Sequence, residues 1–202
     1  MAKPSTTDRA DRFNELSRRR TGPLIDLAEQ AGEITRTCRR MAERFRAGGK
    51  LVVFGNGGPS TDAQHVAVEF VHPVIMGKRA LPALSLTSDV ATLTGVAARA
   101  GFAEAFAHQI RCLGEPSDIA LGLSADGECE NVLRALEVAR EAGMLTVALA
   151  GGDGGTIAAI GAADHVLTAR SADPLVVKEV HVTTYHLLWE LTHVFLERSG
   201  VA

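Results

Sequence analysis

The stretch LVVFGNGGPSTD at residues 51–62 decides the fold, because it joins a short apolar run to a glycine-rich turn and a helix start. Consecutive apolar residues are typical of a strand buried on both faces. Glycines let the backbone turn sharply and bring its N–H groups near a ligand. Pro59 suits the first residue of a helix, whose N-terminus attracts phosphate. The stretch has neither the Gly-Lys-Ser/Thr ending of a Walker A loop nor the GxGxxG spacing of a dinucleotide-binding loop. It therefore leaves two interpretations open, a ligand-binding turn and a tight turn without a ligand.

The same pattern of a short apolar run followed by a polar or glycine-rich loop recurs along the chain. It predicts strands over residues 51–54, 83–86, 119–123, 145–150 and 165–168. Helical stretches intervene, for example over 131–142 and 174–198. Apolar strands that alternate with helices favour an α/β fold with a parallel sheet covered on both faces. The loops then gather at one edge of the sheet, where small-molecule sites form.

Two helices are expected before the first strand. Residues 6–20 predict a short helix that ends at Thr21-Gly22-Pro23. Residues 24–47 carry apolar side chains at spacings of three and four, which predicts one long amphipathic helix that ends at Gly48-Gly49. We expect the apolar stripe of this helix to pack against a partner subunit, and its arginine-rich face to be solvated.

Composition excludes several classes of protein. The chain has 202 residues, of which 46% are hydrophobic and 22% are charged, which is ordinary globular composition and predicts one domain over residues 1–202. A net charge of −3 and an aromatic content of 4% argue against a nucleic-acid-binding surface. Three scattered cysteines predict a reduced, cytoplasmic setting. No apolar run has the length of a membrane helix, so we expect no membrane association.

Ionisable side chains stand on two of the expected helices. His65 and Glu69 have i, i+4 spacing, which puts an imidazole and a carboxylate on one face. Such a pair can bind a metal, share a proton transfer, or form an ordinary surface ion pair. On the last helix, Lys178 and His186 are eight residues apart, about 12 Å along the axis. They can meet one small site only from its two ends or from different subunits.

These pieces together resemble the sugar isomerase (SIS) domain family, and within it the phosphoheptose isomerase group. The resemblance covers most of the chain and rests on motifs in a fixed order: Gly55-Asn56-Gly57-Gly58, Asp62-Ala63, His65 with Glu69, Ser88-Asp89, Gly122-Leu123-Ser124, Gly152-Asp153-Gly154-Gly155, and Glu179-Val180-His181 with His186. It implies a three-layer αβα sandwich with a five-stranded parallel sheet. It also implies a homotetramer with its N-terminal helices, residues 6–47, packed on the sandwich and on a partner subunit.

The resemblance also implies a reaction and its residues. The reaction converts sedoheptulose 7-phosphate reversibly into a heptose 7-phosphate through an enediol. Glu69 matches the base and His186 the acid, while His65, Glu69 and His186 match zinc ligands. The positions that match substrate-binding residues are Asn56, Gly57, Gly58, Ser60, Asp89 and Ser124. Zinc there would polarise the carbonyl as a Lewis acid.

The sequence departs from the family's pattern in three places. Pro59 stands where the family usually has serine, with Ser60 one place later. The second loop, usually rich in Ser and Thr, keeps only Ser124 and Gly127 and gains acids, which predicts weaker phosphate binding. Lys178 stands at the usual glutamine ligand, and a protonated lysine has no lone pair for a metal. We therefore expect weaker zinc binding than in the relatives, or an ammonium that replaces the metal's charge.

Three functions remain open from the sequence. The first is an aldose–ketose isomerase of a sugar phosphate, because Glu69 and His186 are retained. The second is a non-catalytic binding or regulatory protein of the replication-initiator-associating type, favoured by the altered phosphate loop. The third is an isomerase whose substrate lacks that phosphate.

Overall fold

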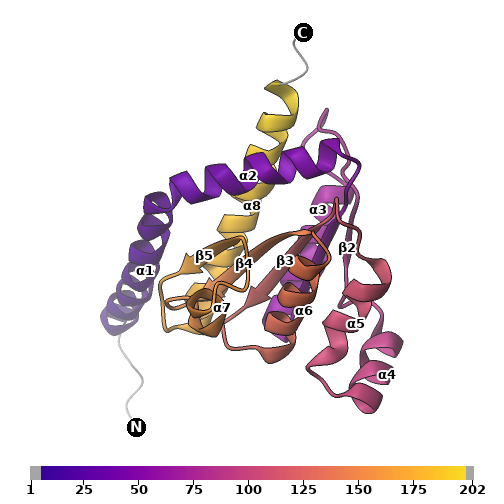
Figure 1. Ribbon diagram of the computed structural model, residues 1–202. Coiled ribbons are helices and arrows are strands. Elements are labelled where there is room, and N and C mark those ends of the chain that lie inside the picture. Colours follow the sequence, from indigo (N-terminus) through magenta and orange to yellow (C-terminus); the bar gives the residue numbers. More distant parts are fainter. Residues whose placement is uncertain (1–5, 199–202) are drawn as a thin grey trace.

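Five parallel strands form the central sheet, in the order β2-β1-β3-β4-β5 (Figure 1). The computed structural model describes residues 6–198. The strands are β1 (Leu51–Gly55), β2 (Ala83–Ser85), β3 (Ile119–Ser124), β4 (Leu145–Gly151) and β5 (His165–Ala169). Each lies within one residue of its expected position at either end. The five-stranded parallel sheet implied by the resemblance is thus confirmed.

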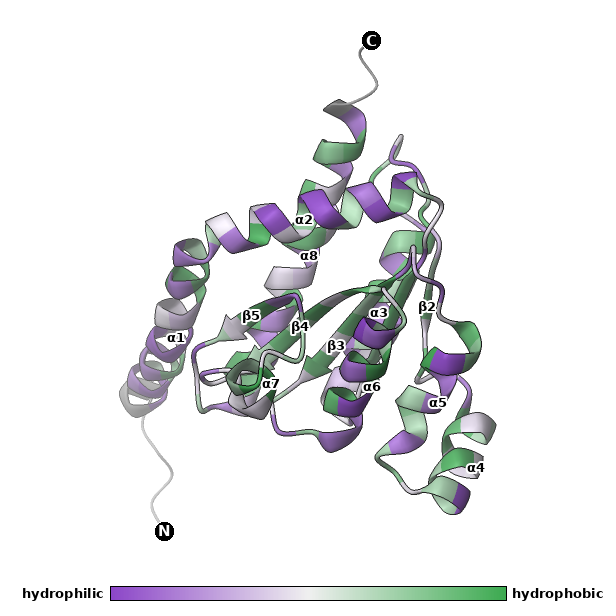
Figure 2. Cartoon of the chain, viewed as in Figure 1, coloured by the Kyte–Doolittle hydropathy of each residue, from purple (hydrophilic) through white to green (hydrophobic). Residues whose placement is uncertain are grey.

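Helices cover both faces of this sheet, which confirms the three-layer αβα sandwich. They are α1 (Thr6–Glu29), α2 (Ala31–Arg46), α3 (Gly58–Val71), α4 (Val90–Ala100), α5 (Glu104–Leu113), α6 (Glu130–Glu141), α7 (Gly155–Ala159) and α8 (Pro174–Arg198). On β1, Leu51 and Val53 belong to a core with α2, α3 and α8, whereas Val52 and Phe54 belong to a second core with α5 and α6. The central strands β1, β3 and β4 are therefore mostly apolar, as their largely green colouring in Figure 2 shows.

The N-terminal helices differ from the expectation. Helix α1 continues through Pro23 to Glu29, and the break lies at Gln30 rather than at Thr21-Gly22-Pro23. The side-chain amide of Gln30 explains this position, because it donates to the carbonyl of Thr168 (2.8 Å) and accepts from the amide of Thr168 (2.9 Å). These bonds tie the chain to the edge strand β5, where α1 and α2 meet at a sharp angle (Figure 1). The expected single helix over 24–47 is therefore wrong.

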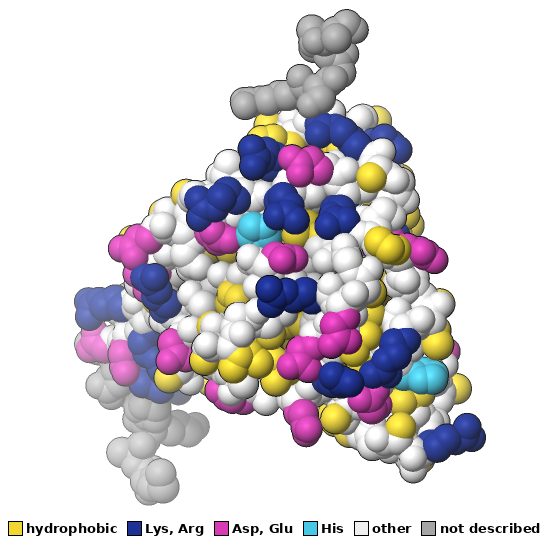
Figure 3. Space-filling view, in the orientation of Figure 1, with side chains coloured by type: hydrophobic (Ala, Val, Ile, Leu, Met, Phe, Trp, Pro, Cys, Tyr) yellow, Lys and Arg dark blue, Asp and Glu magenta, His cyan; other side chains and the backbone are white. Residues whose placement is uncertain are grey.

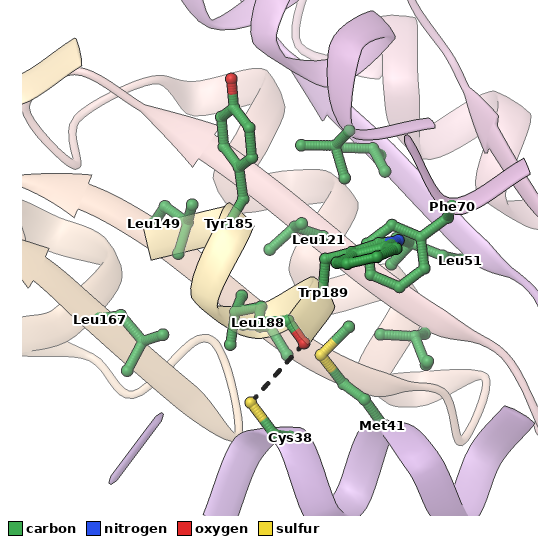
Figure 4. Packing of buried hydrophobic residues seen from close by; sticks show 14 of the residues in the cluster. Cys38, Met41, Leu51, Phe70, Leu121, Leu149, Leu167, Tyr185, Leu188 and Trp189 are labelled. Atoms are coloured by element: carbon green, nitrogen blue, oxygen red, sulfur yellow. Dashed lines mark hydrogen bonds between the residues drawn. The ribbon is translucent and has the colours of Figure 1, made fainter. Parts of the chain in front are cut away.

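The core beneath α2 and α8 holds the large apolar side chains that fix α8 in place (Figure 4). The rings of Phe45 and Phe70 stack with centroids 5.7 Å apart. The thiol of Cys38 approaches the carbonyl of Leu188 at 3.8 Å, and Met41 is fully buried beside it. These contacts place α8 alongside α3, which positions the site described below.

The outer face of α2 is basic, and Lys and Arg side chains gather over it in Figure 3. Two of its arginines pair with acids of the same helix, Arg36 with Glu33 and Arg39 with Glu43. Such exposed pairs contribute little stability, about 0–1 kcal/mol. Of the helices described, none has the length and apolarity that a bilayer crossing requires.

The strand order reverses its direction at β1. The chain moves from β1 to β2 on one side and then to β3 on the other side. In open α/β sheets, such a switch point opens a crevice beyond the carboxyl ends of the two strands. The loops that follow β1 and β3 therefore flank the place where a ligand is expected.

Candidate active site

Helices α3 and α8 run side by side and share a row of polar contacts. We call this row the α3–α8 seam and define it by Asp62, His65 and Glu69 on α3 and Lys178, Tyr185 and His186 on α8. The partners advance together along both helices: Lys178 with Asp62, Tyr185 with His65, and His186 with Glu69. The two helices are thus parallel, with their N-terminal ends together at the carboxyl edge of the sheet.

The centre of the seam brings together the three expected catalytic and metal-ligating residues. Oε1 of Glu69 lies 3.3 Å from Nε2 of His65 and 3.1 Å from Nε2 of His186. The carboxylate is mostly buried, with 13% of its side chain exposed, whereas the His65 and His186 side chains are 47% and 45% exposed. One carboxylate oxygen therefore stands between two imidazoles that a ligand can reach from solvent.

Two further residues hold this centre from α8. The indole N–H of Trp189 donates to the backbone carbonyl of Glu69 at 3.0 Å, which fixes α3 at that turn. The hydroxyl of Tyr185 lies 2.9 Å from Nδ1 of His65. The sequence analysis predicted neither contact. Tyr185 is the only tyrosine in the chain and is adjacent to His186, so its position in the sequence could have marked it as part of the site.

Lys178 occupies the end of the seam nearest the carboxyl edge of the sheet. Its ammonium donates to Oδ1 of Asp62 at 2.6 Å and lies near the carbonyl of Gly58 and the hydroxyl of Thr61 at 3.3 and 3.4 Å. Lys178 and His186 therefore contact different turns of α3, which agrees with their separation of eight residues. The sequence did not predict Asp62 as the partner of Lys178.

The loop after β1 and the first turn of α3 contain four of the expected substrate-binding residues: Asn56, Gly57, Gly58 and Ser60. Asn56 exchanges two hydrogen bonds with Asn131, at 2.6 and 3.0 Å, which joins this loop to the first turn of α6. Gly57 has φ = 60°, a left-handed conformation that favours glycine, and it precedes Gly58 at the start of α3. Ser60 donates to the carbonyl of Gly57 at 2.6 Å.

A cavity of about 320 Å³ opens beside this loop. Asn56, Gly57, Ser60 and Thr87 form a polar wall, and α4 with the start of α5 forms an apolar wall. Helix α4 has no buried residue of its own. The backbone and hydroxyl groups of the polar wall are suited to a polyhydroxylated ligand.

Asp89 caps α4 in the structure. Its carboxylate accepts from the amide of Thr92 at 3.0 Å and from the hydroxyl of Thr92 at 2.6 Å. The Thr92 hydroxyl, followed by its amide, lowers the pKa of Asp89 below the usual value. The carboxylate is therefore an ionised cap of α4, and it lines a different cavity from the one beside the β1 loop.

The loop after β3, residues 124–129, uses its polar groups internally; we call it the β3 loop. The hydroxyl of Ser124 donates to Asp126 at 3.2 Å and accepts from the amide of Gly127 at 2.9 Å. Asp126 also accepts from the amide of Glu128 at 3.0 Å. The carboxylate of Glu128 accepts from both the amide and the hydroxyl of Thr156, at 3.0 and 2.6 Å. Carboxylates of the chain itself thus take donors that an anionic ligand would use.

The donor set of His65, Glu69 and His186 fits a divalent metal. Their ligand atoms all lie within 4.8 Å of one another. Two imidazole nitrogens and one carboxylate oxygen are typical of zinc sites that keep an open position for substrate. The structure thus supports a possible metal site formed by these three residues.

The fold and the site define an α/β protein of the SIS class, with an imidazole–carboxylate centre between helices α3 and α8, which cover one face of a parallel sheet. The sequence profile of the SIS domain matches residues 24–151. Phosphoheptose isomerases from Desulfovibrio desulfuricans and Nitratidesulfovibrio vulgaris are 43% and 39% identical to this chain, over 87% and 86% of it and 82% and 83% of their own lengths.

Solved structures agree with these relatives. A phosphoheptose isomerase from Francisella tularensis superposes with a TM-score of 0.85 and 31% identity, covering 92% of this chain and 98% of that one. The enzyme from Neisseria gonorrhoeae gives a TM-score of 0.81 and 29% identity, with 93% and 98% coverage. The chain therefore belongs to the phosphoheptose isomerases of the SIS domain family, which are intramolecular aldose–ketose isomerases.

Proposed function

We propose that this chain interconverts sedoheptulose 7-phosphate, or a related sugar phosphate, and the corresponding aldose phosphate. The relatives support the reaction class, and one observation at the site carries the proposal. That observation is the position of Glu69, whose carboxylate lies within 3.3 Å of two imidazoles in the α3–α8 seam.

In the proposed mechanism, Glu69 removes a proton from the carbon next to the carbonyl, and His186 gives a proton to the carbonyl oxygen. The product of these two transfers is an enediol. Return of a proton from Glu69 to the neighbouring carbon, with loss of a hydroxyl proton to His186, completes the isomerisation without any net change in atoms. Because His186 and Glu69 are 3.1 Å apart, one enediol can contact both groups.

We propose zinc as the metal that His65, Glu69 and His186 hold. When bound, zinc supplies a Lewis acid that polarises the substrate carbonyl. Lys178 has no lone pair when protonated, and its ammonium is bonded to Asp62, so the proposed set has three protein ligands and an open position.

We propose that the active protein is a cytoplasmic homotetramer. Large apolar side chains are exposed on α3 and in the segment that follows it: Val68, Val71, Val74, Ile75 and Met76. A patch of this kind supports contact with another subunit. Light scattering tests this assembly, and a stable monomer at micromolar concentration would contradict it.

Turnover of sedoheptulose 7-phosphate by the purified protein tests the function. We expect interconversion by the wild type and none by Glu69→Gln, with Glu190→Gln, an exposed glutamate of α8, as the matched control. Absence of turnover in the wild type, with or without zinc, would contradict the proposed reaction.

The β3 loop supports a second candidate, an isomerase whose substrate has no phosphate at this end. The supporting observation is that Asp126 accepts the Ser124 hydroxyl and the Glu128 amide. A comparison of sedoheptulose with its 7-phosphate as substrates distinguishes the two candidates. The non-catalytic alternative predicts no turnover of either sugar.

A further inference from the structure

Tyr185 has its ring in the apolar core but carries a polar hydroxyl group. The residue is 1% exposed and belongs to the cluster of buried hydrophobic side chains beneath α2 and α8. In Figure 4 the hydroxyl points away from the labelled leucines. Its partner is Nδ1 of His65, on the neighbouring helix, at 2.9 Å.

The ring of Tyr185 also packs against both imidazoles of the centre. Its centroid lies 5.5 Å from that of His65 and 4.9 Å from that of His186, and both pairs are nearly perpendicular. Such edge-to-face contacts fix ring orientation as well as position. Among the described residues, Tyr185 is thus the one whose ring packs against the rings of both histidines.

We propose that Tyr185 is a positioning residue, whose hydroxyl holds the imidazole of His65 with Nε2 directed at Glu69. This inference rests on the proposed function for its catalytic consequence, but not for its structural part. The hydroxyl acts through His65 and does not touch the substrate.

A hydroxyl suits this role because it can either donate or accept. When His65 carries its proton on Nε2, that N–H donates to Glu69 and the hydroxyl of Tyr185 donates to the bare Nδ1. When Nε2 presents its lone pair to a cation, Nδ1–H donates to the hydroxyl oxygen instead. The ring keeps one orientation in both states, so the centre can take up a metal without repacking.

The test compares two variants of α8 that each remove one buried hydroxyl. Tyr185→Phe keeps the ring and loses the bond to His65. Thr184→Val is the matched control, because the Thr184 hydroxyl is buried but donates to the carbonyl of Val180, on its own helix, at 2.8 Å. Thermal unfolding verifies that both variants fold.

Nitrogen NMR of the imidazoles in the metal-free protein gives the first readout. We expect the Nδ1 resonance of His65 to lose its hydrogen-bond shift in Tyr185→Phe and to keep it in Thr184→Val. Zinc affinity, measured by competition with a chelator, gives the second readout, and we expect a roughly 10- to 100-fold loss in Tyr185→Phe alone. In turnover, kcat should fall with little change in KM.

An unchanged His65 resonance and zinc affinity in Tyr185→Phe would overturn the proposal. Equal losses in both variants would also overturn it, because they would reflect packing of α8 alone. If the wild type has no isomerase activity, the proposed function fails, while the NMR readout still decides whether Tyr185 positions His65.

Discussion

The α3–α8 seam starts at the edge of the sheet where the β3 loop lies, but the two regions use their polar groups in opposite ways. In the seam, Glu69 and two half-exposed imidazoles converge on a point that a ligand can reach. In the β3 loop, Ser124, Asp126 and Glu128 bond to their own loop or to α7. The groups that we propose for proton transfer are therefore open to a ligand, whereas the polar groups of the β3 loop are already paired.

This difference separates two parts of the function. The proposed proton transfer at the carbonyl end of a sugar uses side chains of the seam alone. Recognition of a phosphate at the other end needs free donors and positive charge, and the β3 loop instead contributes the carboxylates of Asp126 and Glu128. We therefore expect variants of the seam to change rate or stability, and variants of the loop to change preference between ligands.

The largest effect is expected at the centre of the seam. His186→Ala removes the proposed acid and should lower kcat by roughly 10²- to 10⁴-fold. Glu69→Gln should act similarly because it removes the proposed base. His72→Ala, at the exposed C-terminal end of α3, is the control and should retain activity. Wild-type turnover by either site variant would show that the seam is not the catalytic centre.

The buried part of α8 should make stability depend on pH. Burial lowers the pKa of His181 to about 4, from an ordinary value of 6.5. Between these two values the unfolded chain binds a proton at this position and the folded chain does not. The free energy of unfolding should therefore decrease as pH falls from about 6.5 to 4, by about 3 kcal/mol from this group.

Denaturant titrations over this pH range measure the effect. His181→Gln should remove this part of the pH dependence, whereas His72→Ala should keep it. If His181→Gln kept the pH dependence of the wild type, burial of a neutral His181 would not explain the acid sensitivity.

Lys178 should matter for stability because it neutralises a buried carboxylate. The Asp62 side chain is 6% exposed, and Lys178, at 40%, is its partner. Lys178→Met leaves the Asp62 carboxylate without its ammonium partner and should lower the free energy of unfolding by about 2 kcal/mol. This is less than the loss of about 3–5 kcal/mol for breaking a fully buried ion pair, because water screens the charge of Lys178.

Lys50 offers a matched comparison for this variant. It pairs with the buried Asp118 at the amino ends of the strands, and its ammonium donates to Asp118 rather than to a residue of the seam. Lys50→Met should also destabilise the protein, but only Lys178→Met should change zinc affinity if the Lys178 charge acts on the centre. Denaturation and chelator competition give the two values, and equal zinc affinities would exclude such a role for Lys178.

The sequence predicts the sheet well, because strands buried on both faces leave an apolar run that ends in a polar or glycine-rich loop. It also predicts that His65 and Glu69 share a helix face, since that follows from local spacing. The contact of His186 with Glu69 came only from the resemblance, because it depends on how α8 packs on α3. The helix break was misplaced because Gln30 gains its partner, Thr168, from a strand 138 residues away.

The smallest effect is expected from the β3 loop, and it tests the comparison most directly. Asp126→Ser removes a carboxylate while keeping a small polar side chain, and it frees the amide of Glu128 and the hydroxyl of Ser124. At about 4 Å and an effective dielectric constant near 20, a like charge costs on the order of 4 kcal/mol. Because Asp126 is exposed, we expect only part of this, about a tenfold gain in affinity for inorganic phosphate or sugar phosphate.

Calorimetry with inorganic phosphate measures this gain without requiring turnover. Asp153→Asn is the matched control, because Asp153 is also a loop carboxylate that accepts a backbone amide, from Gly155 at 3.1 Å, but it does not bond to Ser124. Glu128 is left intact since it holds Thr156. Equal affinities in the wild type and Asp126→Ser would mean that the phosphate binds elsewhere along the crevice. The contrast between an open seam and a self-paired loop would then not determine which sugars this isomerase accepts.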